Sequence, residues 1–238
     1  MSKRASEFQK SQNRQASLSK RPPLPFLLLL AAVLGAVALI GYQVWSNRPT
    51  ALIALVDYPR GITPDGYPYK GNPEAKIIIE EYTDFQCPAC ARYAREVGAR
   101  LDEKYVKPGK VYYIFRYFPF LGPESFRAAE AAACATEQGK FWEYEHMLLA
   151  NQRGENVGWF SDDRLVSFAT QLGLDRGAFQ NCLLSGKYRD FIRKSVEAAN
   201  QRGVQATPTL FINGEKIEGL YDVIFYETYI DTLLQQVQ

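Results

Sequence analysis

Two cysteines three residues apart, Cys87 and Cys90, are the residues of this chain best suited to chemistry. They follow an apolar, β-branched run at 77–79 and precede a segment of helical character at 91–97. A cysteine that opens a helix lies beside unpaired backbone N–H groups and the positive end of the helix dipole, and both favour a thiolate. Pro88 fits the first helical position, where its missing N–H costs nothing. The spacing therefore predicts a redox centre with Cys87 as nucleophile and Cys90 as its buried partner.

Zinc sites use the same cysteine spacing, so a metal centre is the alternative interpretation. It needs two more ligands, whereas Cys134 and Cys182 lie far along the chain and His146 is the only histidine. A four-cysteine zinc site stays open at this point. We expect no metal and no cofactor other than the redox-active pair Cys87 and Cys90.

A second motif, G-V-Q-A-T-P-T-L-F-I-N-G, lies near the other end of the chain at 203–214. Together with F-Q-C-P-A-C at 85–90, it resembles the DsbA-like branch of the thioredoxin superfamily. The stretches at 115–119 and 128–144 match as well, and the resemblance covers roughly residues 71–238. It implies an α/β thioredoxin fold with a helical insertion.

The resemblance also assigns supporting residues. Pro208 would form a cis peptide bond opposite the cysteine pair, and Thr207 would offer its backbone to an extended substrate as the edge of a strand does. An ordinary trans proline before a strand is the alternative. Glu81 would be a buried acid that moves protons at Cys90. Glu80 competes for that role, because neighbouring strand residues face opposite sides of a sheet.

Hydrophobic periodicity predicts the elements that position these residues. A β–α–β unit should precede a mostly helical block at about 121–202, and a β–β–α unit should follow it. Asn213 and Gly214 are typical of the tight turn of a hairpin. The expected strands are 76–83, 110–118, 209–212 and 215–218, and the expected flanking helices are 88–105 and 222–236.

The N-terminal third has a different character. Residues 1–23 carry six basic residues and one acidic residue, so the rest of the chain has a net charge near −3 out of a total of +2 and offers no basic patch for nucleic acid. Residues 26–45 contain no charge and are long enough as a helix to cross a bilayer. The predicted domains are a cytoplasmic basic tail (1–23), a transmembrane anchor (24–46), a Pro/Gly-rich tether (47–72) and a DsbA-like domain (73–238).

Basic residues before the apolar segment orient the N-terminus toward the cytoplasm and the domain outside. Because the segment is longer than a signal-peptide core and lacks a small-x-small site, we expect a retained anchor rather than a cleaved signal. Within the tether, the run 52–56 adds a strand or lies on the domain surface; the sequence leaves both open.

The remaining cysteines, Cys134 and Cys182, are expected to form a second, structural disulfide. The number of cysteines is even, the domain faces an oxidising compartment, and Cys87 and Cys90 account for one pair. Two buried free thiols are the alternative.

The resemblance implies a protein-disulfide oxidase that donates its disulfide to exported proteins with cysteines. A quinone-linked membrane enzyme resembling DsbB or vitamin K epoxide reductase would reoxidise it. A reductase or isomerase tethered to the membrane, and a non-catalytic binding or chaperone module, are the alternatives.

Overall fold

A computed structural model describes residues 24–46 and 58–237, which belong to two units that divide between Arg48 and Pro49. The described part of the first unit is the helix α2 (Leu24–Ser46). Judged by length and hydropathy together, no helix in the described ranges qualifies as a membrane span. The helix predicted at 24–46 is confirmed. The prediction that it spans a membrane is not supported. The basic tail at 1–23 and the run 52–56 lie outside the described residues.

The second unit is built on a mixed sheet of six strands in the order β1-β2-β4-β3-β5-β6. Strands β3 and β4 are parallel, and the other neighbours are antiparallel. The β-branched and aromatic residues of β3 and β4 suit central, buried strands. The strands are β1 (Arg60–Ile62), β2 (Pro68–Gly71), β3 (Ile77–Thr83), β4 (Val111–Tyr117), β5 (Thr209–Ile212) and β6 (Glu215–Glu218).

The pairing of β3 with β5 brings the two sequence motifs together. Because these strands are antiparallel, with Tyr82 opposite Thr209, the end of β3 lies beside the start of β5. Cys87 follows β3 and Pro208 precedes β5, so both fall at the same edge of the sheet. Asn213 and Gly214, with φ of 48° and 88°, form the predicted turn between β5 and β6.

The helix after the cysteine motif runs without a break from Pro88 to Val106 and contains two π-helical turns. Its parts are α3 (Pro88–Tyr93), η1 (Ala94–Gly98), α4 (Ala99–Leu101) and η2 (Asp102–Val106). The predicted helix at 88–105 is thus confirmed. The predicted helical insertion is also confirmed, and the helices that follow η2 are α5 (Pro123–Thr136), α6 (Phe141–Ala150), α7 (Asp162–Gln171), α8 (Arg176–Ser185), α9 (Arg189–Gln201) and α10 (Val223–Gln236).

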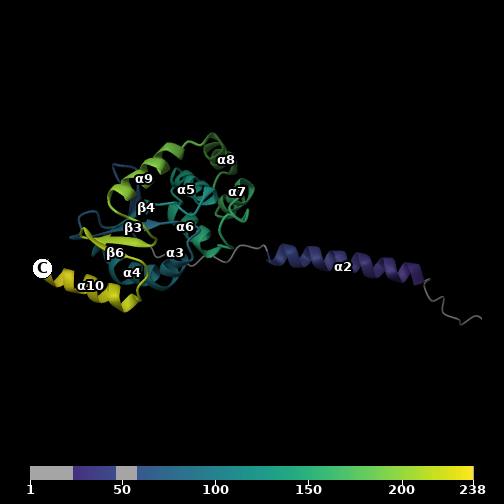
Figure 1. Cartoon of the computed structure of the whole chain (residues 1–238), viewed down its shortest axis with the longest axis horizontal. Helices are drawn as coiled ribbons and strands as arrows, with labels where there is room; N and C mark the ends of the chain where they lie inside the picture. The colour runs from purple at the N-terminus through teal and green to yellow at the C-terminus, as the bar shows by residue number, and fades with distance from the viewer. Residues whose placement is uncertain (1–23, 47–57, 238) are drawn as a thin grey trace, which may run out of the picture. The chain divides into compact units, whose positions relative to one another are not determined.

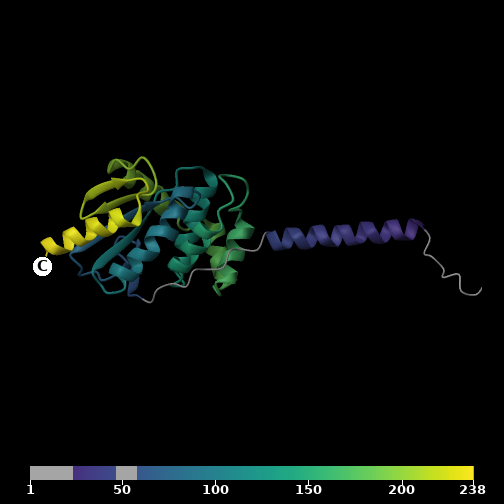
Figure 2. The ribbon, with the colours of Figure 1, turned by 90° about the horizontal axis from the view of Figure 1, so that it is seen from below.

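Helices cover both faces of the sheet. Figure 1 shows α9 above the strands and α4 and α10 below them. The insertion helices α7 and α8 lie at the end of this unit away from α10, as the turned view in Figure 2 also shows. Most buried apolar residues form one cluster that is continuous from the sheet into the insertion.

The predicted tether at 47–72 is wrong for residues 60–71, which belong to the folded domain. They form β1 and β2, and β2 pairs with β4, so the domain begins before residue 73. Aromatic contacts explain this difference: the Tyr67 ring lies 5.1 Å from Phe191 and 4.1 Å from the Arg116 guanidinium. The prolines and glycines of this segment indicated an extended chain, and Pro68 is tolerated as the first residue of its strand.

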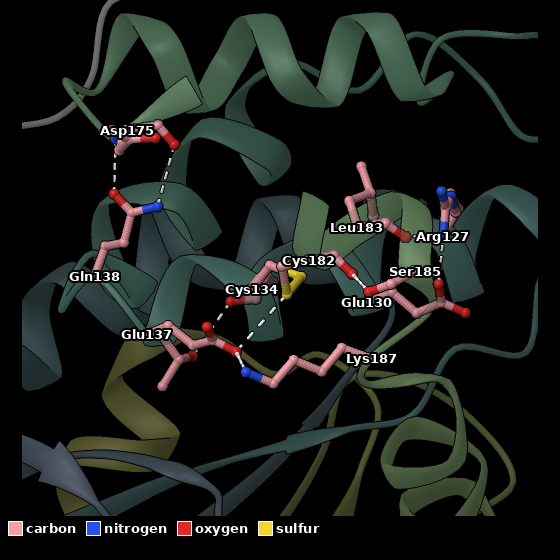
Figure 3. Close-up of a disulfide and its surroundings, with 12 residues drawn as sticks. Arg127, Glu130, Cys134, Glu137, Gln138, Asp175, Cys182, Leu183, Ser185 and Lys187 are labelled. Atoms are coloured by element: carbon pink, nitrogen blue, oxygen red, sulfur yellow. Dashed lines mark hydrogen bonds and ion pairs between the residues drawn. A yellow bond between two sulfur atoms is a disulfide. The ribbon is translucent and has the colours of Figure 1, made fainter. Parts of the chain in front are cut away.

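The predicted disulfide between Cys134 and Cys182 is present and joins α5 to α8, with a Cα–Cα distance of 5.9 Å. Figure 3 shows it beside Glu137, whose Oε1 lies 3.8 Å from Cys182 Sγ and 2.6 Å from Lys187 Nζ. The bridge closes a loop with a sequence separation of 48 within the helical insertion.

Removing this bridge should destabilise the domain. Closing a loop of this length lowers the entropy of the unfolded chain, so a Cys134→Ala/Cys182→Ala variant should lose about 2–4 kcal/mol of unfolding free energy. Urea unfolding in a Cys87→Ser/Cys90→Ser background isolates the effect from the redox pair. In that background, reductant should lower the midpoint only while Cys134 and Cys182 are present. An unchanged midpoint would contradict the structural role.

Candidate active site

Cys87 caps the N-terminus of α3, as the sequence predicts. Its backbone is extended (φ −71°, ψ 119°), and Pro88 occupies the first helical position. Cys90 lies one turn further along and is fully buried, whereas Cys87 retains 8% of its surface. Both are free thiols here, so the site is in its dithiol form. The two sulfurs therefore differ in access, with Cys87 the one that a partner can reach.

The environment also separates the two thiols electrostatically. A hydrogen bond from the Cys90 thiol lowers the pKa of Cys87 to about 6, against the opposing effect of burial, and the backbone N–H groups of Ala89 and Cys90 contribute to the lowering. Burial, together with the hydrogen bond to Cys87, raises the pKa of Cys90 well above its ordinary value. At neutral pH the first thiol is a thiolate and the second is its proton donor.

This asymmetry predicts a pH dependence that alkylation measures. The alkylation rate of the reduced protein by iodoacetamide should rise with pH through a midpoint near 6, about 3 units below an ordinary thiol. Because the folded-state pKa is lowered, the thiolate stabilises the reduced protein most above the unfolded pKa, and that stability declines as pH falls toward 6. A single midpoint above 8 would contradict the assignment. A Cys87→Ser variant is the matched control.

The second motif meets the first at a cis peptide bond between Thr207 and Pro208, as the resemblance implies. In its protonated form, the Cys87 thiol donates a hydrogen bond to the Thr207 carbonyl oxygen, which lies 3.3 Å from Cys87 Sγ. The loop is held from both sides, because Gly219 N donates to Pro208 O at 2.8 Å and Thr209 Oγ1 donates to Ala206 O at 2.7 Å. A substrate segment at Thr207 would therefore lie directly against the Cys87 sulfur.

Two residues that the sequence analysis did not single out fix the loop before Cys87. Asp84 is buried and accepts hydrogen bonds from Gln86 N, from the Ser125 hydroxyl and from the backbone of Phe120 and Leu121. Gln152 Nε2 donates to Phe85 O and Cys87 O at 2.7 and 3.0 Å. Asp84 occurs three residues before the first cysteine, but no local pattern indicates its partners, which come from a distant segment.

Glu81 is the buried acid of β3. Its carboxylate accepts hydrogen bonds from Thr83 Oγ1 and from Tyr113 Oη at 2.5 and 2.7 Å. The Tyr113 hydroxyl in turn contacts the hydroxyl of Tyr93 at 3.1 Å, and Tyr93 lies one turn after Cys90. Burial, followed by repulsion from Glu145, raises the pKa of Glu81 to about 7. The group is thus poised to exchange a proton near neutral pH.

The competing residue Glu80 faces elsewhere. It forms ion pairs with Arg116 and Arg202 at 2.8 and 2.9 Å and is therefore engaged at the surface. Within the described residues, no direct hydrogen bond joins Glu81 to Cys90; the hydrogen-bonded chain from Glu81 runs through Tyr113 to Tyr93, one helical turn after Cys90. The structure accordingly places Glu81 behind the site, and its role in proton transfer stays a prediction.

A Glu81→Gln variant tests that role. We expect the step in which Cys90 loses its proton to slow by about 10–100-fold, because the amide cannot accept it. The measurement is the pH profile of single-turnover thiol exchange, whose inflection near 7 should disappear. A Glu80→Gln variant removes a carboxylate from the same strand without touching Tyr113 and should keep the inflection. A profile unchanged by Glu81→Gln would contradict the prediction.

A buried ion pair lies next to Glu81. Lys70 Nζ is 2.7 and 2.9 Å from the two carboxylate oxygens of Asp102. The same ammonium lies 4.6 Å from the ring centre of Tyr113 and 4.4 Å from that of Trp142. Burial alone would lower the pKa of Lys70, but Asp102 holds it above its usual value. Lys70 therefore stays protonated, and it supports the cluster that orients Glu81.

The cysteines do not form a metal site of the alternative kind. Cys134 and Cys182 are bonded to each other and cannot serve as zinc ligands together with Cys87 and Cys90. Among the described residues, no group of three or more potential ligand side chains is placed to hold a metal.

Comparison with known proteins shows the family to which the chain belongs. The family described as Thioredoxin matches residues 64–232, which is most of the chain. The chain belongs to the thioredoxin family. Its matches include disulfide bond formation proteins and DsbA structures. The probable disulfide bond formation protein D of Bacillus cereus is 31% identical over 148 residues, which span 60% of this chain and 68% of that protein.

Solved structures of thioredoxin-family proteins agree. Wolbachia pipientis alpha-DsbA1 is 27% identical with a TM-score of 0.66, covering 74% of this chain and 94% of that one. The chain also matches longer relatives, such as the Na(+)/H(+) antiporter NhaA 3 of Salinispora tropica, at 34% identity over 184 residues. That match covers 75% of this chain and 27% of the antiporter, so the chain spans about a quarter of that relative's length.

Proposed function

We propose that this protein is a thiol–disulfide oxidoreductase that introduces disulfides into cysteine-containing proteins outside the cytoplasm. The observation that carries the proposal is the unequal pair of thiols: a nucleophilic Cys87 of lowered pKa against a cis proline, and a buried Cys90 of raised pKa. An inert structural bridge would need neither the difference in access nor the strand-like backbone at Thr207. The names of DsbA-like relatives support the same activity.

The reaction proceeds by two exchange steps. A client thiolate attacks Cys87 Sγ of the oxidised pair, forms the mixed disulfide and releases the Cys90 thiolate, which takes a proton. A second client thiolate then attacks the client sulfur of the mixed disulfide and releases the Cys87 thiolate. The client loses two electrons and gains a disulfide, and the enzyme is left as the dithiol. The low pKa of Cys87 makes it a good leaving group in the second step.

Reoxidation completes the cycle. We infer a quinone-linked membrane oxidase resembling DsbB or vitamin K epoxide reductase as the electron acceptor, since the dithiol must pass on two electrons for each client disulfide. This partner would dock where clients do, because Cys87 is the accessible sulfur. The domain itself would need no cofactor beyond its cysteine pair.

We further propose that the segment 24–46 anchors the domain at the cell membrane, with the N-terminus in the cytoplasm. The proposal rests on its uncharged sequence and on the basic residues before it, since no described helix qualifies as a span. An anchor would raise the effective concentration of the domain for membrane partners. Alkaline carbonate extraction decides: retention in the membrane pellet supports the anchor, and release contradicts it.

The reduction potential of the Cys87–Cys90 pair tests the direction of the reaction. The full-length protein is equilibrated against glutathione buffers and its redox state is read by alkylation. A potential near that of DsbA, about −120 mV, supports a disulfide donor. A potential near that of thioredoxin, about −270 mV, overturns the oxidase assignment and favours a membrane-tethered reductase.

A further inference from the structure

Two arginines flank one tryptophan beside the active site. The guanidinium carbon of Arg164 lies 3.6 Å from the ring centre of Trp159, and that of Arg153 lies 5.5 Å from it. Arg164 comes from the first turn of α7, whereas Arg153 and Trp159 belong to the loop between α6 and α7. We call Arg153 and Arg164 the Trp159 arginine pair.

This pair has no acidic partner in the described part of the chain. The carboxylates nearest in sequence, Glu155 and Asp163, are exposed and form no ion pair with either arginine. Of the next ones, Glu124 accepts from Gly158 N and Phe160 N, and Asp162 pairs with Arg127. Burial and the neighbouring charge of Arg153 lower the pKa of Arg164. Two like charges thus lie on one ring without an ion-pair partner, and a carboxylate that bound between them would relieve their repulsion.

The loop that carries the pair is tied to the redox centre. Gln152, adjacent to Arg153, donates its side-chain N–H groups to Phe85 O and Cys87 O. Apolar side chains of the same neighbourhood are exposed: Val157 by 63%, and Phe120, whose N–H is held by Asp84, by 43%. A polypeptide bound at Cys87 would therefore meet both exposed apolar surface and two arginines that have no ion-pair partner.

We propose that the Trp159 arginine pair is a subsite for a carboxylate side chain of the polypeptide that reacts with Cys87. The inference rests on the proposed function, because it assigns a preference to that same site. Planar guanidinium groups bind carboxylates through paired N–H donors, and the indole holds Arg164 in place for this. Clients with Asp or Glu close to the reactive cysteine would be favoured over those without.

Peptide binding tests the subsite without any redox step. The probes are two extended peptides with a central serine in place of cysteine, one with glutamates on both sides and one with glutamines at the same positions. Affinities are measured by isothermal titration with the full-length Cys87→Ser/Cys90→Ser protein at low salt. The glutamate peptide should bind about fivefold more tightly, and high salt should remove the difference.

Arginine variants locate the preference. Arg153→Gln/Arg164→Gln should bind both peptides equally, and Arg153→Gln alone, at an exposed position, should lose part of the preference. Arg92→Gln is the matched control, because it removes a positive charge from the active-site helix α3 and leaves both arginines beside Trp159 in place. This variant should keep the preference for the glutamate peptide. Equal affinity of the parent protein for both peptides, or a preference that survives the double substitution, overturns the proposal. The titrations use the Cys87→Ser/Cys90→Ser variant, which has no redox activity. Their result therefore does not depend on the reduction potential that tests the proposed function.

Discussion

Substituting Cys90 with serine is expected to stall the protein as a covalent complex with its client. Cys87 would still attack a client disulfide as a thiolate, because its position at the N-terminus of α3 is unchanged. This attack is the reverse of the oxidation step, and in that direction the mixed disulfide would lack the buried Cys90 thiol that releases the client. The oxidising direction is lost as well, because the Cys87–Cys90 disulfide cannot form. Turnover should fall by about 10³-fold or more, as for the loss of a nucleophile. Non-reducing electrophoresis after acid quenching should show the trapped complex, and mass spectrometry should place the bond at Cys87.

The converse substitution gives the control. Cys87→Ser should neither turn over nor trap, because Cys90 is fully buried and its pKa is raised well above the ordinary value. A Cys134→Ala/Cys182→Ala variant should turn over like the wild type under conditions where it is folded. Equal trapping by Cys87→Ser and Cys90→Ser would mean that the two thiols are not differentiated, and the proposed mechanism would be wrong.

The sequence predicted those parts of the fold that local patterns encode. The hairpin of β5 and β6 matches the predicted bounds at 209–212 and 215–218, because Asn213-Gly214 specifies its turn. The redox pair was predictable for a similar reason, since Pro88 and the spacing of the cysteines place them on one helical turn. The cis bond at Pro208 came from the family resemblance rather than from any local property of the peptide.

Other features depend on contacts between distant segments and left no local signal. Strands β1 and β2 lie in a stretch whose prolines and glycines indicate a tether, and pairing with β4 makes them part of the sheet. Lys70 and Asp102 are separated by 32 residues. Lysine and aspartate are usually exposed, so neither residue alone indicates a buried position. Asp84 likewise acquires its role from partners about 40 residues away. Such polar clusters become visible only when the fold juxtaposes them.

The buried pair of Lys70 and Asp102 predicts a large loss of stability when one charge is removed. Lys70→Met would fill the same volume but leave the Asp102 carboxylate buried without its cation. A charge left alone in the interior typically costs about 3–5 kcal/mol, whereas the intact pair contributes much less. Urea unfolding at pH 7 should show this loss in the free energy of unfolding. Removing Asp102 as well, in a Lys70→Met/Asp102→Leu variant, should recover most of it.

A surface lysine provides the comparison that makes the prediction specific. Lys104 pairs with Glu227 and Asp231 at 3.0 Å, but its side chain is 36% exposed, so Lys104→Met should cost much less unfolding free energy than Lys70→Met. Equal costs for the two substitutions would contradict the assignment. Lys70→Met also carries a functional signature. Lys70 opposes the rise in the pKa of Glu81, so its loss should move the pH inflection of thiol exchange above 7, which a purely structural lysine would not do.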